Sequence, residues 1–333
     1  MRDHKMPPSS SWIIFSSISI AFVSFLVFNP SLSSLSSLLP RMSTVKSTKA
    51  VMSQTLKHAS IVARRSSDRG HADHGWLNTY HTFSFASYFD PHFKNFGALR
   101  VLNEDRVAPN SGFPSHTHRD AEIFSYILSG ELTHRDSMMG NGATKDQYYR
   151  IRRGDIQFTT GGSGIAHSEQ NEHDSDTVHF LQIWALPWKS GLTPRYHDLT
   201  IDEDQKRQGF VTIISPLKAG RQASPAQEKA AIPAVPGTIP IHADMLVGAS
   251  IIAGSSSATW TVGGNGAVAS RKDRKVYVHL PMTKEGKAKI RLPDTTILAE
   301  GDGAFVTGVN AGDGLEIQSV GVAEAEVVVL DSD

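Results

Sequence analysis

The chain has 333 residues, with 33 Lys and Arg, 33 Asp and Glu, 15 His and no Cys. The balanced charge removes any global attraction to nucleic acid or acidic membranes, so a nucleic-acid role would need a local patch or a protein partner. The lack of cysteine excludes disulfides, thiol catalysis and thiolate metal sites. A metal site in this chain must therefore be built from imidazole and carboxylate groups.

The N-terminal region differs from the rest, because an apolar run at 12–28 leads into a Ser-rich stretch with few acidic residues. The run is at the short limit for a membrane anchor, and it also fits part of a targeting peptide. A third interpretation is a leader that is absent when translation begins at Met42 or Met52. In that case we expect a cytoplasmic or nuclear protein, and otherwise organelle targeting or membrane anchoring through 12–28. Residues 1–58 are assigned to a non-globular N-terminal extension.

From Ser60 onward, short runs of alternating or β-branched residues lie between turn-forming glycines and asparagines. Their close spacing, with no helical pattern between them, predicts an antiparallel barrel or sandwich. The first set of runs falls at 96–103, 121–128, 146–153, 155–160 and 179–186. The second set falls at 210–215, 239–253, 259–263, 275–281, 287–292, 295–308 and 325–331. The sequence therefore predicts an all-β protein with one domain at 59–198 and another at 199–333.

Two pairs of potential metal ligands share the same spacing. His116 and His118 are two residues apart, so on a β-strand both imidazoles lie on one face while Thr117 points away. His167 and Glu169 repeat this spacing after a glycine-rich turn. Either pair alone could also consist of surface side chains at a strand end. Together they predict two strands that present three imidazoles and one carboxylate to one barrel interior.

This ligand set suits one divalent transition metal. Fe(II) is the preferred ion, with Mn, Ni, Co, Cu or Zn as alternatives, and open coordination positions remain for a substrate or O₂. A closed structural zinc site is disfavoured because thiolate ligands are absent.

The ligand segments resemble two motifs of the cupin superfamily. The sequence GFPSHTHRDAE at 112–122, followed by Gly130, resembles the first motif. The stretch from Gly154 to Asn171 resembles the second, with Thr160 where cupins usually place a proline. The pirin family is the closer resemblance, extending from about Arg65 to the C-terminus and carried by the segments 112–141, 161–171 and 181–196. It implies a bicupin of two stacked barrels, in which the first barrel holds the metal and the second lacks metal ligands.

Two carboxylates compete for the fourth ligand position. In most cupins the Glu of the first motif, here Glu122, binds the metal, whereas the resemblance to pirins places the carboxylate at Glu169. We follow the pirin pattern because Glu169 shares a strand face with His167. Glu122 lies four residues beyond His118, so on a regular strand it would also face inward and could orient an imidazole.

Other polar and aromatic side chains receive structural interpretations. We expect His134 and Asp136 to be polar groups of a strand and a turn rather than ligands. Trp184 and Trp188 are expected to pack in the core and at the barrel edge rather than to stack on a substrate.

The resemblance to pirins implies two alternative functions. The first is a quercetin 2,3-dioxygenase-like oxidoreductase that cleaves a flavonol with O₂. In it, the metal would acidify the flavonol 3-hydroxyl, and Glu169 would be the catalytic group that takes its proton. The second is an iron-sensing transcriptional co-regulator that binds protein partners without turnover. We expect a monomer that has no direct contact with nucleic acid.

Overall fold

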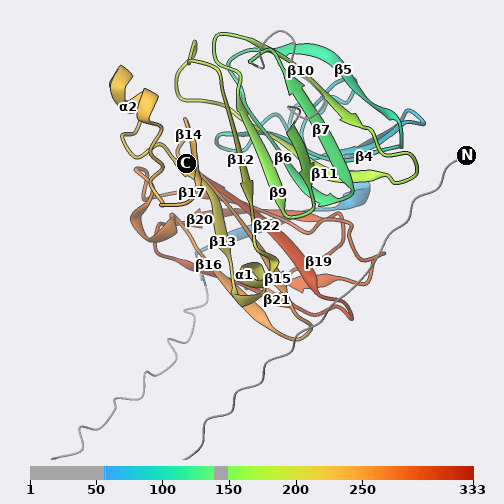
Figure 1. The fold of residues 1–333 in the computed structure, drawn as a ribbon. Helices are drawn as coiled ribbons and strands as arrows, with labels where there is room; N and C mark the ends of the chain where they lie inside the picture. Colours follow the sequence, from blue (N-terminus) through green and yellow to red (C-terminus); the bar gives the residue numbers. More distant parts are fainter. Residues whose placement is uncertain (1–55, 57, 139–148) are drawn as a thin grey trace, which may run out of the picture. The chain divides into compact units, whose positions relative to one another are not determined.

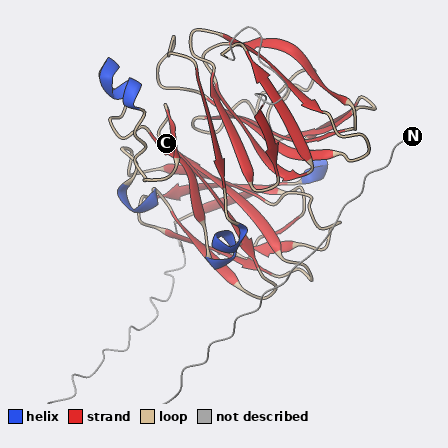
Figure 2. Ribbon diagram, viewed as in Figure 1, coloured by secondary structure: helices blue, strands red, loops and turns tan. Residues whose placement is uncertain are grey.

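The computed structural model describes residues 56, 58–138 and 149–333, so the apolar segment 12–28 and all of the predicted N-terminal extension except Leu56 and His58 lie outside the described residues. Within this described part the regular secondary structure is almost entirely β-strand, as Figures 1 and 2 show, which confirms the predicted all-β class. None of the helices in these residues combines the length and the apolar character needed to cross a membrane.

The first barrel consists of a seven-stranded sheet and a four-stranded sheet (Figure 1). The order across the larger sheet is β12 (Arg195–Thr200), β9 (Asp155–Thr160), β6 (Glu122–Ser129), β11 (Val178–Ala185), β4 (Leu99–Val107), β3 (Leu77–His81) and β2 (Gly70–Asp73). The order across the smaller sheet is β5 (Ser111–His118), β10 (Ile165–Asn171), β7 (Glu131–Asp136) and β8 (Tyr149–Arg152).

The second barrel repeats this arrangement of seven and four strands. Its larger sheet runs β1 (Ser60–Arg64), β20 (Gly303–Val309), β17 (Arg274–His279), β22 (Ala325–Ser332), β15 (Met245–Ile252), β13 (Val211–Pro216) and β14 (Ile239–Ile241). Its smaller sheet runs β16 (Ser257–Thr261), β21 (Gly314–Ser319), β18 (Lys289–Arg291) and β19 (Ile297–Ala299).

Strand β1 precedes the first barrel in sequence but belongs to the second. It pairs antiparallel with β20, so that Ser60 lies opposite Thr307 and Arg64 opposite Gly303. The linear boundaries 59–198 and 199–333 stay a prediction, and β1 adds a strand from the first segment to the sheet of the second barrel.

Short helices lie between and beside the strands. Helix α1 (Glu203–Gln208) joins the barrels, and the side chain of Asp202 accepts a hydrogen bond from its first turn. Helix α2 (Pro225–Ala230) begins at a capping box formed by Ser224 and Gln227. The 3₁₀ turns η1 and η3 span Ser66–Asp68 and Gly264–Gly266.

The core has three layers. One lies between the two larger sheets, which pack on each other, and one lies inside each barrel. Phe124 and Tyr126 of β6 point toward the second barrel and pack in one cluster with Val328 and Leu330 of β22. The alternate residue Ile127 points into the first barrel. Strand β22 is buried on both faces, which explains why its sequence is a continuous apolar run rather than an alternating one.

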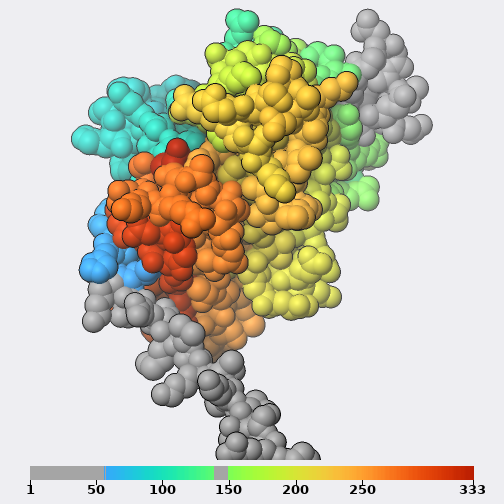
Figure 3. All heavy atoms as spheres, turned by 90° about the vertical axis from the view of Figure 1, so that its left-hand side faces the viewer, coloured from blue at the N-terminus to red at the C-terminus, as the bar shows by residue number. Residues whose placement is uncertain are grey.

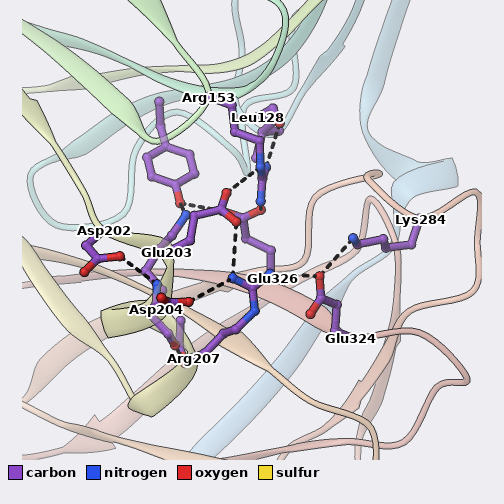
Figure 4. Close-up of polar contacts among 12 residues, drawn as sticks. Leu128, Arg153, Asp202, Glu203, Asp204, Arg207, Lys284, Glu324 and Glu326 are labelled. Atoms are coloured by element: carbon purple, nitrogen blue, oxygen red, sulfur yellow. Dashed lines mark hydrogen bonds and ion pairs between the residues drawn. The ribbon is translucent and has the colours of Figure 1, made fainter. Parts of the chain in front are cut away.

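A buried ion cluster ties the barrels to the connecting helix. The Lys206 ammonium of α1 donates to Tyr126 Oη of β6 at 3.0 Å and to Glu326 Oε1 of β22 at 2.9 Å. The Arg153 guanidinium reaches the other Glu326 oxygen at 2.9 Å, and Figure 4 shows it beside Glu203 and Glu326. Because Lys206 is fully buried, loss of one partner would leave an uncompensated charge in the core.

Candidate metal centre

Strands β5 and β10 bring three histidines together in the first barrel. They pair antiparallel, with His167 opposite His116 and Ile165 opposite His118. The ring centroids of the three imidazoles lie 4.6–4.7 Å apart, and one nitrogen from each lies within 4.8 Å of the others. Thr117, between the two histidines of β5, is exposed, as the alternation of side chains along a strand requires.

The imidazole of His116 is held with one nitrogen free for a ligand. Its Nδ1 lies 2.7 Å from the carbonyl oxygen of Pro114. A carbonyl can only accept, so Nδ1 carries a proton, and in the neutral ring the lone pair is on Nε2. This Nε2 lies 3.1 Å from Nε2 of His167, so two of the candidate ligand atoms converge on the same point.

Burial keeps the other two imidazoles uncharged. Desolvation, together with the neighbouring imidazoles of His134 and His116, lowers the pKa of His167 to about 3. Desolvation likewise lowers the pKa of His118 to about 4, helped by His167 and His116. Both rings are therefore neutral near pH 7 and offer lone pairs to a cation.

Glu169 lies on the same face of β10 as His167 and is 1% exposed. Its Oε1 accepts hydrogen bonds from Gln157 at 2.9 Å and Ser125 at 3.0 Å, and its Oε2 accepts one from Gln182 at 2.7 Å. Its carboxylate is not in the group of three converging nitrogens among the described residues. The role of Glu169 as fourth ligand stays a prediction.

The inward orientation expected for Glu122 is wrong. Its Oε1 lies 2.8 Å from Nδ1 of His242 in the second barrel, and its Oε2 accepts from Thr160 at 2.8 Å. The even spacing between His118 and Glu122 does not place them on one face, because they are on different strands. Strand β5 ends at His118, and Asp120 turns the chain with a φ of 49° before β6 begins. Glu122 therefore joins the two barrels instead of orienting a metal-site imidazole.

His134 is more closely associated with the site than its sequence interpretation implies. It is fully buried, its ring centroid lies 5.1 Å from that of His167, and its Nε2 lies 3.2 Å from Asp136. Trp184 packs its ring edge-on against His118, with centroids 4.8 Å apart, so it forms part of the wall of the site.

Sequence reasoning missed the three residues that hold Glu169. Gln157 and Gln182 fall within the predicted strands 155–160 and 179–186, at positions that alternate with apolar residues facing the second barrel. Ser125 occupies the equivalent position on β6. All three could have been identified as polar residues at positions of a buried strand whose side chains point into the first barrel.

The arrangement fits a divalent transition metal. Two imidazoles are held neutral, His116 turns its Nε2 toward His167, and a buried carboxylate shares the interior. Nitrogen and oxygen donors of this kind suit Fe, Mn, Co, Ni, Cu or Zn. Nδ1 of His167 is buried without a hydrogen-bond partner among the described residues.

Comparison with known proteins extends these observations. The family model described as Pirin matches residues 62–185. "Quercetin 2,3-dioxygenase" of Escherichia coli K12 is 44% identical over 156 residues, which are 47% of this chain and 63% of that protein. The chain thus spans somewhat under two thirds of that relative. "Pirin-like protein" of Caulobacter vibrioides is 39% identical over 52% of this chain and 71% of that protein.

Solved structures agree along most of the chain. YhhW from Escherichia coli has a TM-score of 0.65 and 29% identity, covering 82% of this chain and 98% of its own. The structure described as bacterial pirin YhhW in complex with nickel(II) has a TM-score of 0.64 at the same identity, covering 82% and 99%.

Proposed function

The chain belongs to the pirin family, and from this premise we propose that it is a metal-dependent dioxygenase that opens the ring of a flavonol such as quercetin. The observation that carries the proposal is the convergence of His116, His118 and His167 in the interior of the first barrel. The name of the Escherichia coli relative, "Quercetin 2,3-dioxygenase", supports the choice of reaction. The similar solved structure described as a bacterial pirin in complex with nickel(II) supports the choice of a divalent metal.

The residues of the site would have two roles, to bind the metal ion and to accept a proton from the substrate. His116, His118 and His167 would hold the ion through their ring nitrogens, with Glu169 as the fourth ligand. When bound, the metal supplies Lewis acidity toward the 3-hydroxyl of the flavonol. Glu169 would accept the proton of that hydroxyl on a carboxylate oxygen.

Hydrogen bonds prepare Glu169 for this role. The amides of Gln157 and Gln182 and the hydroxyl of Ser125 all donate to it, so its carboxylate is fixed in one orientation before substrate arrives. Trp184 beside His118 contributes an aromatic wall that suits a flat substrate.

The test is an O₂-uptake assay with quercetin on protein loaded anaerobically with Fe(II). We expect uptake in the wild type and its loss in His116→Ala. The matched control is His173→Ala, which removes a histidine from an exposed loop and should leave uptake unchanged. No uptake with any flavonol by the iron-loaded wild type, or full uptake by His116→Ala, would contradict the proposal. Tight iron binding without turnover would favour the iron-sensing co-regulator.

A further inference from the structure

A cavity lies at the seam between the two barrels, away from the three clustered histidines. It has a volume of about 650 Å³ and is formed by segments from both halves of the chain, including residues 97–98, 186–188, 216–221 and 266–269. Figure 3 shows this face, on which the teal, gold, orange and red parts of the chain meet near the C-terminus. None of the three clustered histidines lines the cavity.

Small residues keep the cavity open. Ala98, Ala234, Ala243 and Ala267 contribute walls that do not fill the space. Elsewhere the seam is closely packed, because the two larger sheets share one continuous apolar core. Leu217 and Val268 add apolar surface, so part of the wall is suited to a flat hydrophobic group.

Two cations at the cavity lack acidic partners. Lys218 and Arg221 are exposed, and no carboxylate in the described part of the chain lies within ion-pair distance of either. Two carboxylates also line the cavity. Asp244, which is largely buried, already accepts from Arg274 and from the backbone N–H of Ser270, and the exposed Asp333 forms no ion pair with Lys218 or Arg221.

A hydrogen-bond donor is also unused. Nε1 of Trp188 is buried and has no partner among the described residues, although the indole lines the cavity. A buried donor left unpaired costs free energy, so an acceptor that reaches it from the cavity would be favoured.

We propose that this cavity binds a small aromatic anion, such as an aromatic carboxylate. The ring lies against Leu217 and Val268, the anionic group pairs with Lys218 and Arg221, and an oxygen accepts from Trp188 Nε1. A cavity of this volume is in the range that holds a small organic ligand. The site requires neither the metal nor the proposed dioxygenase reaction.

Calorimetric titration with three matched probes tests the proposal on the full chain. 2-Naphthoate carries both ring and anion, 2-naphthylmethanol carries the ring alone, and inorganic phosphate carries the anion alone. We expect one molecule of 2-naphthoate per chain, with the other two probes at least about tenfold weaker. Equal binding of the alcohol would refute the role of the charge.

Variants locate the binding. The double variant Lys218→Glu/Arg221→Glu should weaken 2-naphthoate binding at least about tenfold. The control Lys289→Glu/Arg291→Glu reverses two exposed cations on β18, outside the cavity, and should leave affinity unchanged. Trp188→Phe, which keeps an aromatic ring but removes the N–H, should also weaken binding.

His116→Ala separates this site from the metal centre, because it should abolish O₂ uptake while leaving 2-naphthoate binding intact. The proposal is overturned if wild-type protein shows no 2-naphthoate binding up to about 10 mM. It is equally overturned if the Lys218→Glu/Arg221→Glu variant binds as tightly as the wild type, or if His116→Ala abolishes the binding.

Discussion

Replacing Gln182 with Met tests whether the hydrogen bonds around Glu169 prepare the metal site. The Gln182 amide donates to Glu169 Oε2 at 2.7 Å, and Met keeps most of the side-chain volume while removing the donor. A hydrogen bond to a charged group contributes about 1.5–3 kcal/mol, which corresponds to about a 10- to 150-fold loss of metal affinity if Glu169 ligates the ion. This agrees with the roughly 10- to 100-fold effect of residues that orient metal ligands.

The assay is a competitive titration with Ni²⁺ or anaerobic Fe²⁺. The matched control is Gln170→Met, because Gln170 lies beside Glu169 on β10 but donates to the carbonyl oxygen of Phe113 at 2.7 Å. In a Glu169→Ala background, the change at Gln182 should cost no further affinity, since its hydrogen-bond acceptor is gone. Wild-type affinity in Gln182→Met, or an equal loss in Gln170→Met, would refute the reasoning.

Three further predictions concern stability and ligand choice. Lys206→Met should lower the free energy of unfolding, measured in urea, by about 3–5 kcal/mol. The control Arg207→Met, at an exposed neighbour, should lower it by less than about 1 kcal/mol. Equal effects of the two substitutions would contradict the stabilising role of the buried ion cluster. Burial raises the pKa of Asp105 to about 7, so in metal-free protein its contribution to stability is present below pH 4 and lost as pH rises through 7. The free energy of unfolding should therefore fall less between pH 5 and pH 8 in Asp105→Asn than in the wild type. An equal fall in the two proteins would contradict this prediction. Glu122→Ala should lower stability by about 1–3 kcal/mol without weakening metal binding, and a loss of metal affinity on titration would restore Glu122 as a ligand.

The sequence predicted those features that depend on alternation along one strand. His116 and His118 share a face because side chains alternate along this end of β5, beyond the point where its pairing with β10 shifts register, and the same alternation places His167 and Glu169 on one face of β10. Glu122 was misjudged because a turn interrupts the count of residues between it and His118.

Features that join distant segments were not predictable from local pattern. The pairing of β1 with β20 connects residues separated by most of the chain, and no local signal specifies that partner. The contact of His242 with Glu122 likewise depends on how the two barrels pack. The glutamines around Glu169 carry a local polar signal, but their shared target becomes evident only when three strands are placed around it.

The most direct test of the central claim is the iron content of the protein after anaerobic Fe(II) loading and desalting, measured on the wild type, His167→Ala and Glu122→Gln. We predict one iron per chain in the wild type and in Glu122→Gln, and its loss in His167→Ala, because His167 is one of the three converging imidazoles. Full iron retention in His167→Ala, or its loss in Glu122→Gln alone, would contradict the account.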